Sequence, residues 1–138
     1  MISRILMASS ATIIGLLGLG HLILTFRGRK LLPRDDSLRE SMQRVAPVIT
    51  TQTTIWKAWI GFNASHSMGA ILFGLTYGYL ALVHGDVLFG SPFLQLVGLA
   101  MVGGFVVLAR IYWFKTPLVG ATLSLVLYVS SVVLAWLD

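Results

Sequence analysis

Four polar side chains interrupt an otherwise apolar stretch of the sequence, and among them is the group best able to do acid–base or ligand chemistry, an imidazole. They lie in the first half of the run Ile55–Val83 and are Asn63, Ser65, His66 and Ser67. At ~1.5 Å per residue, a helix over this run is long enough to cross a bilayer. Because polar groups inside a bilayer need partners, we expect function to be found here first.

The periodicity of this run separates a polar and small-residue face from an apolar one. At 100° per residue, one face collects Trp56, Trp59, Asn63, His66, Ser67, Ala70, Gly74, Tyr77 and Gly78. The opposite face carries Met68, Leu72 and Leu75, together with Lys57. We therefore expect the first face to point into the protein, and Lys57 to reach along the lipid-facing side toward the headgroups.

Four long apolar runs must position this cluster. With 57% apolar and 11% charged residues, the chain is too hydrophobic for an ordinary water-soluble domain. Each run reaches the ~20 residues needed to cross the hydrocarbon core, and the predicted spans are residues 5–26, 55–83, 92–114 and 117–137. We expect an all-α protein, a single four-helix transmembrane domain over residues 1–138, whose first span is an uncleaved helix rather than a signal peptide.

Charge asymmetry predicts how the spans are oriented. The connection after the first span carries Arg27, Arg29, Lys30, Arg34, Arg39 and Arg44, whereas the connection 83–91 has no Lys or Arg. The positive-inside rule then places the basic connections in the cytoplasm and both ends of the chain outside. This sorting explains the net charge of +5 without nucleic acid, which we do not expect as a partner. With no cysteine, disulfides and thiolate metal sites are excluded.

The first, third and fourth spans have polar or small-residue stripes of their own. The first aligns Ser10, Ala11, Ile14, Gly18, His21 and Thr25, the third Gln95, Leu99, Gly103 and Arg110, and the fourth Ala121, Ser124, Tyr128, Ser131 and Ala135. Such stripes let membrane helices approach closely and hydrogen-bond. Counted from the cytoplasmic ends at ~1.5 Å per residue, Arg110 lies ~6 Å deep, His21 ~8 Å, Asn63 ~12 Å and His66 ~16 Å. We expect one polar pocket in the cytoplasmic half, lined by His21, Trp56, Trp59, Asn63, His66, Ser67 and Arg110.

Several chemistries suit such a pocket. Two histidines on neighbouring spans could ligate haem or a metal, but the count above separates them by ~8 Å in depth, and the spans offer no Cys, Asp or Glu as a third ligand. Catalysis by His66 would lack an intramembrane carboxylate to assist it. The polar groups could also serve helix packing alone. Finally, aromatic walls and a few polar anchors could bind the head of a lipid or a quinone.

Local signals predict where the helices begin. Ser91-Pro92 and Thr116-Pro117 each place a hydroxyl before a proline, the pattern of a capped helix start. In the first connection, Ser37 and Glu40 form a capping box, and Leu38, Met42 and Val45 fall at i, i+4 and i+7 in an amphipathic pattern. We expect a short helix on the cytoplasmic membrane surface there, with its basic residues near anionic lipid.

The block W-K-A-W-I-G-F-N-A-S-H-S-M-G over residues 56–69, with Gly20-His21 and residues 32–35 (L-P-R-D), resembles a family of small bacterial four-span membrane proteins of uncharacterised activity. The similarity covers about residues 15–80. It implies location in the bacterial inner membrane.

We therefore expect a non-enzymatic, multi-pass protein without a cofactor. Its role is either that of an accessory subunit in a larger membrane complex or that of a binder of an amphipathic ligand, with membrane lipid, such a complex or a second copy as partner. The alternative is a membrane-embedded enzyme or haem or metal protein that uses His21 and His66.

Overall fold

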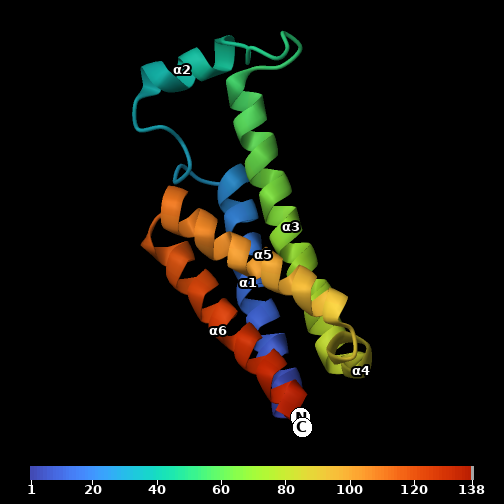
Figure 1. Cartoon of the computed structure of the whole chain (residues 1–138). Helices are drawn as coiled ribbons and strands as arrows, with labels where there is room; N and C mark the ends of the chain where they lie inside the picture. The colour runs from blue at the N-terminus through green and yellow to red at the C-terminus, as the bar shows by residue number, and fades with distance from the viewer. Residues whose placement is uncertain (138) are drawn as a thin grey trace. The chain divides into compact units, whose positions relative to one another are not determined.

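A computed structural model describes residues 1–137 and shows helices as the only regular elements within them (Figure 1). Six helices follow one another: α1 (Ile2–Phe26), α2 (Asp36–Arg44), α3 (Ile55–Val83), α4 (Gly85–Phe89), α5 (Pro92–Tyr112) and α6 (Lys115–Leu137). The helices α1, α3, α5 and α6 are long and apolar enough to cross a membrane. The prediction of an all-α protein with four helices long and apolar enough to cross a membrane is confirmed.

The helix boundaries confirm most of the local signals and correct two. The hydroxyl of Ser91 accepts a hydrogen bond from the Leu94 amide at 3.3 Å, and Pro92 begins α5, as predicted. Helix α6 begins at Lys115, so Thr116 lies inside the first turn and is not its cap. The cause is local: the Leu118 amide donates to the Phe114 carbonyl, which starts the helix two residues earlier than predicted.

Helix α2 is capped by Asp35 rather than by the predicted Ser37. A carboxylate oxygen of Asp35 accepts both the amide and the hydroxyl of Ser37, each at 2.8 Å. Because the Ser37 hydroxyl donates its proton to Asp35, Ser37 does not cap the helix itself. It lies in the first turn and is bonded to the residue that does. At the other end, the Val45 carbonyl accepts the amide of Ile55 at 2.9 Å, which joins the end of α2 to the start of α3.

The described residues divide into two compact units, and α1 and α3 each contribute to both. The first unit comprises Met1–Leu17 and residues 70–137, and the second comprises Gly18–Gly69. The prediction of a single domain stays a prediction, and Asp138 lies outside the described residues.

In the first unit, parts of the four long helices pack around one core. Its members are Met7, Ala11, Ile14, Ala70, Phe73, Tyr77, Ala81, Leu88, Val102, Phe105, Ala121 and Tyr128. Where α1 crosses α3, Gly15 and Gly74 meet backbone to backbone, since a Cβ on Gly74 would lie 2.7 Å from the Cα of Gly15. The absence of side chains at this crossing is what lets the two helices touch.

The start of α5 is held by buried tyrosines. The hydroxyl of Tyr77 donates to the Leu94 carbonyl at 2.6 Å, and that of Tyr128 donates to the Gln95 carbonyl at 2.8 Å. Both rings lie against Gly98, where a Cβ would be 2.5 Å from a ring carbon of Tyr77 and 2.8 Å from a ring carbon of Tyr128. The Gln95 side chain is itself bonded to the Phe89 carbonyl and to Trp136. This polar network in an apolar unit has its hydrogen bonds satisfied and so rigidifies it.

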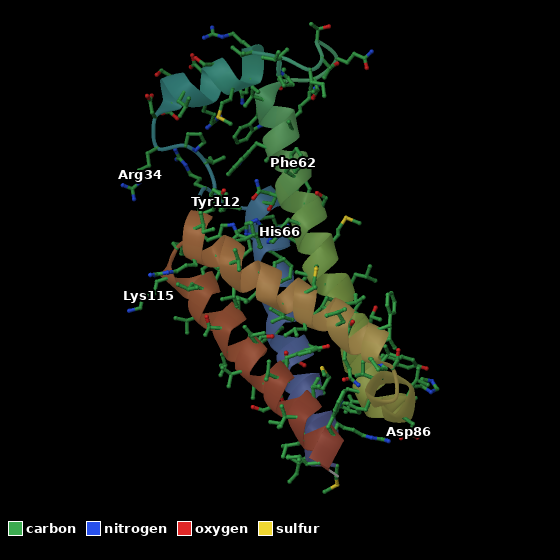
Figure 2. All side chains as sticks on the ribbon, in the orientation of Figure 1. Arg34, Phe62, His66, Asp86, Tyr112 and Lys115 are labelled. Carbon is green, nitrogen blue, oxygen red and sulfur yellow. The ribbon has the colours of Figure 1, made fainter. Side chains whose placement is uncertain are left out.

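The link between α3 and α5 is tied to the beginning of α1. Arg4 donates from Nη2 to a carboxylate oxygen of Asp86 at 2.7 Å, and Asp86 lies in the short helix α4 (Figure 2). The Arg4 guanidinium also packs against the backbone of Gly85. This ion pair is surface-exposed, so it contributes little by charge alone.

Burial confirms the predicted inward face of α6 and corrects that of α5. In α6, Ala121, Ser124, Tyr128 and Ser131 are buried, as the stripe predicts. In α5, however, the buried stripe is Gln95, Gly98, Val102, Phe105 and Ala109, whereas Leu99 and Arg110 are exposed. Because α5 is apolar almost all round, its sequence pattern defines the inward direction poorly. The packing of Gly98 against the tyrosines sets that direction instead.

Candidate functional site

A polar cluster lies in the second unit, where α1 and α3 run side by side. Nε2 of His21, on α1, and Oδ1 of Asn63, on α3, are 2.8 Å apart. The imidazole of His66, one turn further along α3, meets the His21 ring edge to face, with ring centroids 5.5 Å apart and planes at 89° (Figure 2). We call His21, Asn63 and His66 the histidine–asparagine cluster. Its three side chains are half-buried.

The hydrogen bonds of Asn63 determine which nitrogen of His21 carries a proton. The amide nitrogen of Asn63 donates to the Trp59 carbonyl at 2.7 Å, so the oxygen of the same amide is the atom that faces His21. A carbonyl oxygen only accepts, and Nε2 of His21 must therefore donate. In a neutral imidazole this places the lone pair on Nδ1.

The contact between the two histidine rings corrects the depths counted from the sequence. That count separated His21 from His66 by ~8 Å because it measured each helix from its own end. Asn63 lies eight residues from the start of α3, whereas its partner His21 lies five residues from the end of α1. Helix α3 thus extends about 5 Å further than α1 in the second unit, and this offset removes most of the counted separation.

Two hydroxyl groups close to the cluster are bonded within their own helices. Ser67 is fully buried and donates to the Asn63 carbonyl at 2.9 Å. Thr25 is buried and donates to the His21 carbonyl at 2.8 Å. Thr25 was expected to hydrogen-bond to a neighbouring helix and was not among the predicted site residues. Its position four residues after His21 could have indicated the bond from its hydroxyl to the His21 carbonyl.

The predicted aromatic residues differ in exposure. Trp59 keeps 43% of its surface exposed, and Trp56 is half-buried. A shallow depression of about 270 Å³ lies on α3 and is lined by Ala58, Gly61, Phe62 and Ser65, none of which belongs to the predicted site. Phe62 and Ser65 are exposed there, and the Ser65 hydroxyl donates to the Phe62 carbonyl. The predicted face and this depression are thus distinct surfaces of one helix.

Arg110 is the one predicted site residue that belongs to the first unit. It lies in the last turn of α5, where its side chain is exposed, next to the buried Ala109. The other six predicted residues are all in the second unit. The structure therefore brings together His21, Asn63 and His66 within the second unit, with Ser67 and Trp59 bonded to Asn63.

The arrangement favours hydrogen bonding over metal ligation. Nε2 of His21 is directed at Asn63, and the two rings touch edge to face, whereas a bis-imidazole haem has its iron between the two ring nitrogens. Among the described residues, no three His, Asp or Glu side chains gather as metal ligands would. Ser65 and Ser67 both donate to backbone carbonyls of α3, so neither hydroxyl proton is directed at the His66 ring in the manner of a nucleophile–base pair.

Comparison of the chain with protein-family models, with curated proteins and with solved structures finds no match. The resemblance noted for the block at residues 56–69 therefore stays a prediction. Function has to be argued from the site itself.

Proposed function

We propose that the protein is a non-enzymatic, multi-pass protein of the bacterial inner membrane that binds the polar head of an amphipathic molecule, a lipid or a quinone-like compound, at the histidine–asparagine cluster. The observation that carries the proposal is the 2.8 Å contact between His21 and Asn63 with the His66 ring packed against it. Small polar anchors beside aromatic walls are typical of ligand sites.

The position of the cluster within the spans supports a functional role. Polar side chains at this depth lower the stability of an inserted helix, and they are typically found where a ligand or a partner needs them. Helix packing alone would be served by serine pairs, such as those between α1 and α6. The two imidazoles differ from these serines, which are buried, because both rings are half-buried and His66 lies on the same helix face as the partly exposed Trp59.

The orientation and the location in the cell are parts of the same proposal. The basic residues before α3 favour placing the connection 27–54 in the cytoplasm, with the histidine–asparagine cluster in the cytoplasmic half. The short helix α2 would then lie at the cytoplasmic membrane surface, with its basic residues close to anionic headgroups. The inner membrane of a bacterium follows from the resemblance of residues 56–69.

The experiment is native mass spectrometry of the protein extracted gently from its own membrane. We expect a discrete additional mass in the unmodified protein, and its loss in His66→Leu. The matched control is His84→Leu, because His84 is an exposed histidine outside the cluster, bonded to Tyr79. If His66→Leu retains the same bound mass as His84→Leu, the cluster is not the site.

Arg110 belongs to the first unit and is therefore not included in this proposal, and its place in the site stays a prediction.

A second candidate function, accessory subunit of a larger membrane complex, has its own supporting observation. The depression lined by Ala58, Gly61, Phe62 and Ser65 lies on an exposed face of α3, and small residues on such a face allow another helix to approach closely. This role requires stoichiometric co-purification with larger subunits in mild detergent, and its loss in Gly61→Leu. Recovery of the protein only as a monomer would argue against it.

A further inference from the structure

The hydrogen-bond donors in and next to the histidine–asparagine cluster are mostly used by the protein itself. The donating atoms and their acceptors are Thr25 Oγ1 to the His21 carbonyl, Ser67 Oγ to the Asn63 carbonyl, Asn63 Nδ2 to the Trp59 carbonyl, and His21 Nε2 to Asn63 Oδ1. Three of these four bonds end on backbone carbonyls. The second N–H of Asn63 is the one amide proton that this set leaves over.

The remaining polar atom of His21 is an acceptor that reaches the surface. Since Nε2 carries the proton, Nδ1 of the neutral ring presents a lone pair. Within the described residues no hydrogen bond is formed by Nδ1, while every fully buried side-chain nitrogen or oxygen has a partner. Nδ1 is therefore accessible from outside the protein, in a helix that spans the membrane.

We infer that the ligand head carries a hydroxyl group and donates its proton to Nδ1 of His21. This inference rests on the proposed function and narrows it to hydroxyl-bearing amphipaths, either a quinol or a glycerolipid with a free hydroxyl. A quinone or an ester offers only acceptor oxygens, and these would face the Nδ1 lone pair without a proton between them. The second N–H of Asn63 can donate to either kind of oxygen and does not discriminate between them.

The test compares two matched pairs of probes on the full-length protein in phosphatidylcholine nanodiscs, whose headgroup has no hydroxyl. Decylubiquinol and decylubiquinone differ in two hydroxyls against two carbonyls, and monoolein and methyl oleate differ in the glycerol hydroxyls. Titrations read by native mass spectrometry, without oxygen for the quinol, give a Kd for each. We expect the hydroxyl member of at least one pair to bind about tenfold more tightly, the worth of one hydrogen bond. The pair that discriminates identifies the source of the hydroxyl.

A conservative variant separates this contact from the structural role of His21. In His21→Gln, the side-chain amide can still donate to Asn63 from the position of Nε2, but no lone pair replaces Nδ1. We expect the ratio of the two Kd values, carbonyl probe over hydroxyl probe, to fall to about one in this variant. The unfolding temperature should stay near that of the unmodified protein. His84→Gln is the matched control and should keep the preference. A tenfold preference that persists in His21→Gln overturns the inference.

The tautomer can be read directly by NMR, with His21→Gln used only to assign the His21 signal. Nitrogen-15 NMR of the protein labelled at its three histidines distinguishes an Nε2–H ring from an Nδ1–H ring. We expect the signals of one Nε2–H ring to disappear in His21→Gln, which assigns them to His21. In the unmodified protein, the Nδ1 signal of this ring should move when the hydroxyl probe is added. A His21 ring protonated at Nδ1 instead would overturn the inference.

The outcomes also distinguish failure of the inference from failure of the proposed function. Equal binding of both members of both pairs, with all binding lost in His66→Leu, leaves the site in place and overturns the hydroxyl preference. Tighter binding of decylubiquinone or methyl oleate than of its hydroxyl-bearing counterpart also overturns the hydroxyl preference. Absence of binding by all four probes, with a bare mass from the native membrane, overturns both.

Discussion

Ser10 of α1 and Ser124 of α6 bond to each other reciprocally in the first unit. Each hydroxyl donates to the other residue's carbonyl, at 2.8 and 3.0 Å, and the two hydroxyl oxygens lie 2.8 Å apart. Both residues are fully buried. Seven residues away in each helix, Ser131 donates to the Ser3 carbonyl at 2.6 Å. Because residue numbers fall along α1 as they rise along α6 between these two contacts, the two helices pack antiparallel along a seam of serines. Figure 1 draws α1 in blue and α6 in red.

Removing one hydroxyl from this seam should reduce stability by a modest amount. We expect Ser10→Ala to lower the free energy of unfolding by about 0.6 kcal/mol and by at most about 1.7 kcal/mol, the range of interhelical hydrogen bonds in membranes. Ser10→Leu should cost more, because a larger side chain has no space in the seam. Steric trapping in bicelles measures both. Ser65→Ala, which removes an exposed hydroxyl bonded within its own helix, is the control, and equal losses in Ser10→Ala and Ser65→Ala would contradict the role of the seam.

The glycine crossing of α1 and α3 predicts opposite effects of the same substitution at two positions. In Gly74→Ala the new Cβ would lie 2.7 Å from the Gly15 Cα and 2.8 Å from the Ala11 carbonyl oxygen, so the backbones must separate. We expect a loss of about 1–3 kcal/mol in unfolding free energy. Gly104→Ala meets nothing within 4 Å and should be neutral or stabilising by about 0.5–1 kcal/mol. A Gly74→Ala protein as stable as Gly104→Ala would show that the crossing is looser than described.

The cap of α2 predicts acid sensitivity confined to that helix. The hydrogen bonds from the Ser37 hydroxyl and amide lower the pKa of Asp35 below its usual range. Because the pKa of Asp35 is lower in the folded state, the ionised carboxylate stabilises the helix fully at pH values above the unfolded-state pKa of about 3.9. This stabilisation is lost as the pH falls through the lower, folded-state pKa. Hydrogen exchange of the α2 amides should therefore quicken in that acid window. Asp35→Asn keeps a capping oxygen without the charge, so its exchange should lack this step. If Asp35→Asn showed the same acid-induced increase in exchange, the increase would have to come from another titrating group.

The predicted orientation can be measured directly because the chain has no cysteine. The single-cysteine variants are Gln43→Cys in α2 and Val87→Cys in α4, both at exposed positions. The two positions lie on connections that are predicted to be on opposite sides of the membrane. In intact cells, we expect a membrane-impermeant maleimide to label the variant at 87 and to leave the variant at 43 unlabelled until the cells are opened. The reverse pattern would invert the orientation and place the histidine–asparagine cluster in the outer half.

Sequence alone determined the features that depend on composition and short-range periodicity. The four spans follow from the length of the apolar runs, because any backbone in lipid must bond to itself as a helix. The Ser91 cap follows from its position before Pro92, since both residues act on the nearest amides. The inward face of α6 follows from hydroxyl residues spaced at three and four, a pattern that the surrounding valines and leucines do not share.

Tertiary structure decided what depends on how one helix lies against another. The buried stripe of α5 passes through Ala109 and leaves Arg110 exposed, because Gly98 packs against two tyrosines. The contact between His21 and His66 depends on the offset between α1 and α3, and a pattern within one helix carries no information about an offset between two. That offset placed Asn63 opposite His21 and thereby fixed which nitrogen of the imidazole holds the proton.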